Sequence, residues 1–105
     1  MTDPSSHRKY AVLTPKLRPK YSVLDPELTI GLPPHITAAT GMDALTHAVE
    51  AYIGKSNTKN TAKALEAMRL IFGNLESAYQ NGGDLEARGN MLLASYSAEI
   101  AFTRA

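Results

Sequence analysis

Apolar residues in the second half of the chain recur three and four positions apart, the spacing of an amphipathic helix. After residue 60 this spacing places a set of apolar residues on one side of a predicted helix: Leu65, Met68, Ile71, Phe72, Leu75 and Tyr79. The run Asn81-Gly82-Gly83 ends that helix, and Asp84 is suited to cap the next one. The next helix has a stripe made of Leu85, Leu92, Tyr96 and Ile100, with small residues such as Ala94 and Ala98 that let neighbours approach closely. The pattern therefore predicts two helices after residue 60.

An earlier helix is predicted from about residue 34 to Ile53. Pro33 and Pro34 suit a first helical turn, where a missing N–H costs nothing, and Gly54 suits the C-terminal end. The polar residues 55–60 then predict a loop.

The first third of the chain differs in composition, because all six prolines lie at or before Pro34. Two stretches rich in β-branched and aromatic residues, Arg8–Thr14 and Lys20–Leu24, are predicted to be short strands. The expected fold class is mainly α with two short N-terminal β-strands. Two lone strands are marginally stable in water, and the last helix has no stop signal before Ala105. We therefore expect the chain to be a fragment of a larger protein.

Composition narrows the range of partners and compartments. The 105 residues suit one small domain, and a formal net charge of +1 gives no electrostatic reason to expect nucleic acid. No apolar run is long enough to span a membrane, and the first residues lack an apolar signal region. The absence of cysteine excludes disulfides and thiolate metal sites. These features predict a cytoplasmic location without nucleic-acid or membrane partners.

Candidate chemistry lies in the first predicted helix, where Asp43 and His47 are four residues apart and project from the same face. A carboxylate oxygen and an imidazole nitrogen there can share one divalent cation such as iron(II) or zinc. From spacing alone, an ordinary surface ion pair is the more common explanation. Two ligands also do not make a complete catalytic metal site, which usually has three or more protein ligands.

The residues around this pair resemble a known family. The run Gly41–Tyr52, Gly-Met-Asp-Ala-Leu-Thr-His-Ala-Val-Glu-Ala-Tyr, resembles the central signature of the iron-containing, metal-dependent (group III) alcohol dehydrogenases. Tyr21–Thr29 and Leu32-Pro33-Pro34 are similar to the segments that precede this signature in the family, and the predicted later helices are similar to those that follow it.

The resemblance implies a two-domain enzyme with an α/β domain that binds NAD or NADP and an all-α, dehydroquinate synthase-like metal domain. In the family an aspartate and three histidines hold the metal, and Asp43 and His47 fall on the first two of these positions. Lys9 falls on a lysine that approaches the cofactor, and Leu28 on a residue that lines the cofactor cleft. The implied reaction is hydride transfer between a small alcohol or aldehyde and nicotinamide, with Fe²⁺, Zn²⁺ or another divalent metal as Lewis acid.

The same resemblance assigns residues 1–30 to the edge of the cofactor domain and residues 31–105 to the first, incomplete part of the metal domain. Neither the family's glycine-rich phosphate loop nor its last two ligand histidines lie within these residues, so the isolated chain is expected to be inactive. His7 and His35 precede Asp43 and are expected to be surface histidines, and Glu50 a solvated carboxylate.

The alternative is a non-catalytic helical interaction protein that associates with itself or with another chain through exposed apolar helix faces. On either interpretation, those faces make a homo-oligomer an expected form.

Overall fold

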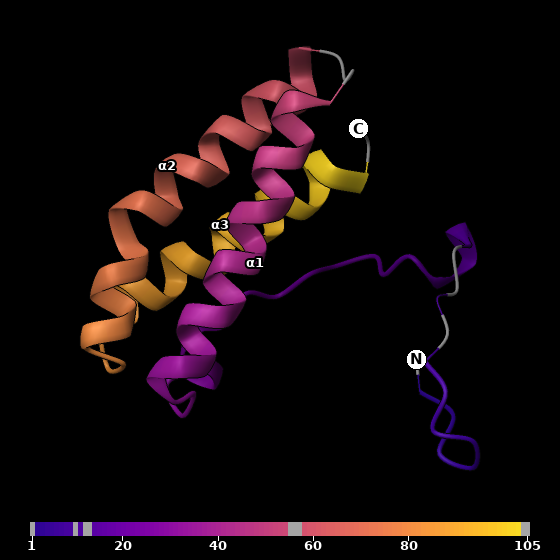
Figure 1. Ribbon diagram of the computed structural model, residues 1–105, viewed down its shortest axis with the longest axis horizontal. Coiled ribbons are helices and arrows are strands. Elements are labelled where there is room, and N and C mark those ends of the chain that lie inside the picture. The colour runs from indigo at the N-terminus through magenta and orange to yellow at the C-terminus, as the bar shows by residue number, and fades with distance from the viewer. Residues whose placement is uncertain (1, 10, 12–13, 55–57, 104–105) are drawn as a thin grey trace.

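Three long helices carry most of the structure (Figure 1). The computed structural model describes residues 2–9, 11, 14–54 and 58–103. The helices are α1 (Pro34–Ile53), α2 (Thr58–Gln80) and α3 (Leu85–Thr103). In Figure 1, α1 and α2 run in opposite directions side by side, and α3 crosses both. None of the helices is long and apolar enough, within the described residues, to cross a membrane.

The ends of the helices follow from local chemistry. The Pro33 carbonyl accepts hydrogen bonds from the amides of Ile36 and Thr37, which starts α1 although no side chain caps it. At α3 the Asp84 carboxylate accepts a hydrogen bond from the Ala87 amide at 3.0 Å, so the predicted N-cap is confirmed. The predicted loop at residues 55–60 is wrong for its last part, since α2 already begins at Thr58; residues 55–57 lie outside the described residues.

The helices meet through alanine. Three layers of buried side chains run along the bundle, each with one residue from every helix: Ala44, Ile71 and Ala94; Ala48, Ala67 and Ala98; Ala51, Ala64 and Ala101. Large apolar residues such as Met68 and Leu75 pack around these layers rather than within them. The apolar sides predicted from the spacing are therefore only partly buried: Phe72 is 77% exposed, and Tyr79 and Tyr96 are exposed as well.

The two predicted strands are not formed in the described residues. Residues 20–24 are irregular, and Tyr21 and Val23 are each 86% exposed. Of the predicted strand Arg8–Thr14, the described part holds only an isolated bridge from Lys9 to Thr2, while residues 10, 12 and 13 lie outside the described residues. A strand needs a neighbouring strand to satisfy its backbone groups, and no described segment provides one. This N-terminal part contains instead two short 3-10 helices, η1 (Pro15–Leu17) and η2 (Pro26–Thr29).

Only part of the N-terminal segment contacts the helices. The 3-10 helix η2 packs on α3, where the Pro26 ring lies beside Gly89. The segment before η1 lies well away from the bundle (Figure 1). There the hydroxyls of Ser5 and then Ser6, which donate hydrogen bonds to Asp3, hold the pKa of that exposed carboxyl below its ordinary value.

Candidate metal centre

The structure brings Asp43 and His47 together, as the helical spacing predicted. Both lie on α1, and Asp43 Oδ1 is 3.9 Å from His47 Nε2. The Asp43 side chain is 70% exposed and the His47 side chain is 31% exposed, so a solute can reach the space between them. The residues that follow each of them, Ala44 and Ala48, are buried in the alanine layers, which leaves this pair at the edge of the contact between α1 and α3.

Two residues of α3 complete the surroundings of His47. Glu99 Oε2 lies 3.6 Å from His47 Nδ1, and the Phe102 ring stacks on the imidazole with centroids 4.6 Å apart and an interplanar angle of 25°. Sequence reasoning missed both residues. They are more than fifty positions from His47, so only the packing of α3 against α1 shows that they meet it.

The pair fits a divalent cation. Two donors bound tetrahedrally to one cation at about 2.0–2.2 Å lie about 3.3–3.6 Å apart. The two donor atoms stand at 3.9 Å, so they must approach by a few tenths of an ångström to share a cation. One carboxylate oxygen and one imidazole nitrogen also match the ligand preference of iron(II), zinc and similar ions. Within the described part of the chain, no group of three or more histidine, aspartate and glutamate side chains is arranged to hold a metal. Within the described residues, Asp43 and His47 are therefore a candidate pair that needs further ligands to hold a metal.

The two predicted cofactor residues do not join this pair. Lys9 is exposed in the N-terminal segment, in the bridge with Thr2. Leu28 lies in η2 and is 83% exposed, so its side chain faces away from the helices. Their assignment to the cofactor stays a prediction.

The remaining histidines lie on the surface. His7 and His35 are both exposed, as predicted, and His7 has a positive φ of 55° directly after the turn at residues 4–6. Glu50 is also exposed, one turn after His47 on α1.

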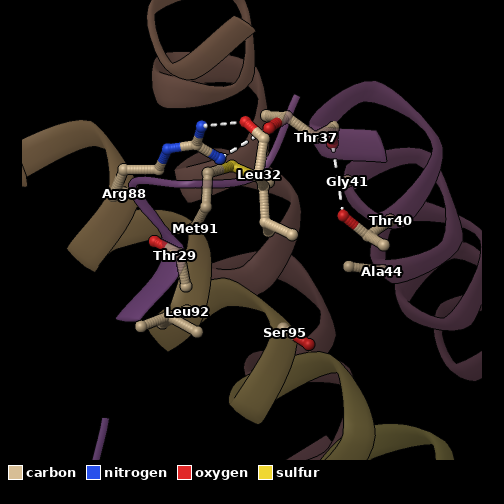
Figure 2. Close-up of a pocket in the computed structure, with 10 residues that line it drawn as sticks. All are labelled: Thr29, Leu32, Thr37, Thr40, Gly41, Ala44, Arg88, Met91, Leu92 and Ser95. Atoms are coloured by element: carbon tan, nitrogen blue, oxygen red, sulfur yellow. Dashed lines mark hydrogen bonds between the residues drawn. The ribbon is translucent and has the colours of Figure 1, made fainter. Parts of the chain in front are cut away.

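A cavity of about 240 Å³ opens beside the N-terminal half of α1 (Figure 2). Its walls come from α1, α3 and the segment before α1, and they are formed by Thr29, Leu32, Thr37, Thr40, Gly41, Ala44, Arg88, Met91, Leu92 and Ser95. At one end Arg88 is buried and its guanidinium donates three hydrogen bonds: to the Thr37 hydroxyl at 2.5 Å, to the Leu32 carbonyl at 3.2 Å and to the Gly82 carbonyl at 3.1 Å. Arg88 thus ties the start of α1 to the turn between α2 and α3.

A second, more open hollow lies between α1 and α2. It is lined mainly by apolar side chains, including Met42, Phe72 and Tyr79. It contains no candidate metal ligand other than Glu76.

Comparison with known proteins identifies the helical part. Residues 37–105 match the family described as "Fe-containing alcohol dehydrogenase family, C-terminal". The chain belongs to this family. The resemblance inferred from Gly41–Tyr52 is thereby confirmed, and Asp43, His47 and Glu99 all lie within the matched residues.

Relatives of this family member include alcohol dehydrogenases of several kinds. Over its whole length it is 47% identical to a 1,3-propanediol dehydrogenase of Klebsiella pneumoniae, and over 97% of its length it is 46% identical to an NAD-dependent methanol dehydrogenase of Bacillus methanolicus. The chain spans 27% of the length of each of these relatives.

A solved structure gives the same fold. The sulfoacetaldehyde reductase from Bifidobacterium kashiwanohense, determined in complex with NAD⁺, matches 99% of this chain with a TM-score of 0.90 at 35% identity. The match covers 28% of that enzyme. The helical fold expected of the metal domain is therefore confirmed, while the predicted N-terminal strands are not.

Proposed function

We propose that the chain forms the active-site helix and its two supporting helices in an NAD(P)-dependent, metal-dependent alcohol dehydrogenase. The reaction is hydride transfer between a small alcohol or aldehyde and nicotinamide. The observation that carries the proposal is the approach of Asp43 and His47 to 3.9 Å, in a chain that belongs to the Fe-containing alcohol dehydrogenase family.

Each residue of the pair has a defined part. Asp43 supplies one negative charge and His47 a neutral nitrogen donor, so a divalent ion between them keeps a net positive charge. When bound, the cation supplies Lewis-acid polarisation of the substrate oxygen. Asp43, with its exposed side chain, lies on the solvent side of the pair, while the Phe102 ring covers one face of the His47 imidazole. The chain's own residues thus bind and orient the metal and limit water on the α3 side.

Assignments for the rest of the enzyme follow from the family. We propose that residues 1–30 belong to the edge of the cofactor domain and that residues 31–105 belong to the metal domain. Lys9 and Leu28 are proposed to approach NAD or NADP, and iron(II) or zinc is the proposed metal. An NAD⁺ complex of the sulfoacetaldehyde reductase and the NAD dependence of the methanol dehydrogenase support the nicotinamide cofactor.

The test is metal content and activity of the natural protein. We expect Asp43→Ala and His47→Ala each to lower the affinity for Co²⁺ by more than roughly a hundredfold, beyond the usual effect of losing a residue that only supports a ligand. Oxidation of methanol, 1,3-propanediol and other short primary alcohols with NAD⁺ or NADP⁺ should fall in parallel.

His35→Ala is the matched control, because it removes an exposed histidine from the same helix. It should leave both metal content and activity unchanged. Metal content that stays at the level of the unmodified protein in both Asp43→Ala and His47→Ala would refute the ligand assignment.

A further inference from the structure

The His47 ring is contacted on both of its nitrogen edges and on one face. Asp43 lies at Nε2, Glu99 at Nδ1, and Phe102 stacks against the ring. We propose that Glu99 is a positioning residue: it accepts the Nδ1–H of His47 and so keeps Nε2 directed toward the cation shared with Asp43. This inference rests on the proposed metal site.

The geometry indicates that Glu99 supports His47 and is not itself a ligand of the metal. Glu99 and Asp43 approach different nitrogens of the imidazole, at 3.6 Å and 3.9 Å. A cation bound by Nε2 and Asp43 lies beyond one edge of the ring, whereas Glu99 faces the other nitrogen. The absence of any three-residue metal cluster among the described side chains agrees with this separation. Glu99 therefore acts on the metal through His47.

The chemistry of imidazole explains why such a partner matters. A neutral histidine carries its proton on one nitrogen and offers a lone pair on the other, and the hydrogen bond at one nitrogen selects which form is present. A carboxylate at Nδ1 favours the form with Nδ1–H, which leaves the Nε2 lone pair for a metal. The present 3.6 Å is longer than a hydrogen bond of about 2.7–3.2 Å. Because the Glu99 side chain is 58% exposed, we expect it to rotate and close this gap.

We propose that α3 also fixes the orientation of the His47 ring. Phe102 follows Glu99 by three residues, so both side chains project from one face of α3 toward His47. Phe102 sets the plane of the imidazole through stacking, and Glu99 sets which edge of the ring faces the cation.

Co²⁺ affinity of the natural protein, measured by competition with a chelator, tests the proposal. Glu99→Gln keeps the size of the side chain and removes its charge, and we expect about tenfold weaker Co²⁺ binding, the lower end of what loss of such a partner costs. Glu50→Gln is the matched control, because Glu50 is an exposed carboxylate one turn from His47 for which the described structure records no ion pair. It removes the same charge from the neighbourhood and should change the affinity by less than about threefold in physiological salt, where exposed charges are screened.

A second measurement does not depend on bound metal. In metal-free protein with ¹⁵N-labelled histidine, long-range proton–nitrogen NMR spectra distinguish the two neutral forms of His47, whose signals are assigned by their loss in His47→Ala. We expect the Nδ1–H form to predominate and to lose its predominance in Glu99→Gln but not in Glu50→Gln. Thermal unfolding of each variant checks that the fold is kept.

The outcomes separate this inference from the proposed function. If His47→Ala abolishes Co²⁺ binding while Glu99→Gln and Glu50→Gln have equal affinities and unchanged His47 spectra, Glu99 has no positioning role and the metal site stands. If His47→Ala binds Co²⁺ normally, the metal site itself is wrong. A tenfold loss with a changed form of His47 in Glu99→Gln alone supports the proposal.

Discussion

Gly41 lies on α1 where side chains of both other helices come close to its backbone. A Cβ atom added there would overlap the Leu75 Cδ1 methyl and lie 3.1 Å from Leu75 Cδ2 and 3.2 Å from Met91 Cε. Gly73, in the middle of α2, offers the opposite surroundings, because a Cβ added there meets no atom within 4 Å. The two glycines form a matched pair for testing how tightly the bundle is packed.

We expect Gly73→Ala to raise the free energy of unfolding and Gly41→Ala to lower it. Replacement of glycine by alanine inside a helix stabilises it by about 0.5–1 kcal/mol, because alanine restricts the unfolded backbone. At Gly73 nothing opposes this gain. At Gly41 the added methyl forces Leu75 and Met91 to move, and overpacking of this kind costs about 1–3 kcal/mol. Since both neighbours are partly buried side chains rather than backbone, we expect a net destabilisation of about 1 kcal/mol for Gly41→Ala.

Urea unfolding followed by far-ultraviolet circular dichroism measures the difference. The unfolding free energies of Gly41→Ala and Gly73→Ala should be separated by about 2 kcal/mol, with unchanged slopes in denaturant. Equal stabilisation by both substitutions would show that Leu75 and Met91 do not press on Gly41, and the reasoning about close approach would fail.

Two further substitutions test single interactions. Arg88→Met removes all three hydrogen bonds of the buried guanidinium and leaves the Leu32 and Gly82 carbonyls without this partner. We expect it to lower the free energy of unfolding in urea by about 3 kcal/mol. The control is Arg69→Met, at an exposed position on α2, which should change that free energy by less than about 0.5 kcal/mol. Asp84→Ala removes the N-cap of α3, so it should lower the free energy of unfolding by about 1 kcal/mol and speed hydrogen exchange of the Ala87 amide. Asp84→Asn keeps a capping oxygen and should be nearly neutral. Equal effects of the two substitutions would contradict the capping role.

Local signals in the sequence predicted the helices well. Proline at the start of α1 and Asp84 before α3 act within a few residues, so their effect can be judged without knowledge of the fold. The predicted strands Arg8–Thr14 and Lys20–Leu24 were wrong for the described residues, because a strand depends on a partner that local sequence does not reveal.

The core was harder to predict than the helices. Hydrophobicity favoured large residues such as Phe72, but the helices pack through alanines, and Phe72 is left on the outside. The close approach predicted at Ala94 and Ala98 is confirmed, since both lie in the buried layers. The alanines of α1 and α2 in these layers were not singled out, because alanine is weakly hydrophobic and frequent in any helix.

The residues of the candidate site also fall into those that local sequence predicts and those that only the packing of the helices shows. Asp43 and His47 are neighbours on one helix and were predicted from their spacing. Glu99 and Phe102 reach His47 from another helix and were not predicted. Arg88 was also missed, because two of its partners, Leu32 and Thr37, lie more than fifty positions away in the sequence.

The alanine layers have a consequence for the precision of the candidate metal centre. An alanine side chain has no rotamers, so the spacing of α1 and α3 at the layer of Ala48 and Ala98 does not change when side chains reorient. These two alanines directly adjoin His47 and Glu99 in the sequence. We therefore expect the distance from imidazole to carboxylate to vary mainly through the rotations of those two side chains. A single larger residue in this layer, such as valine for Ala98, would lengthen it and, through the proposed role of Glu99, weaken metal binding without replacing Asp43 or His47.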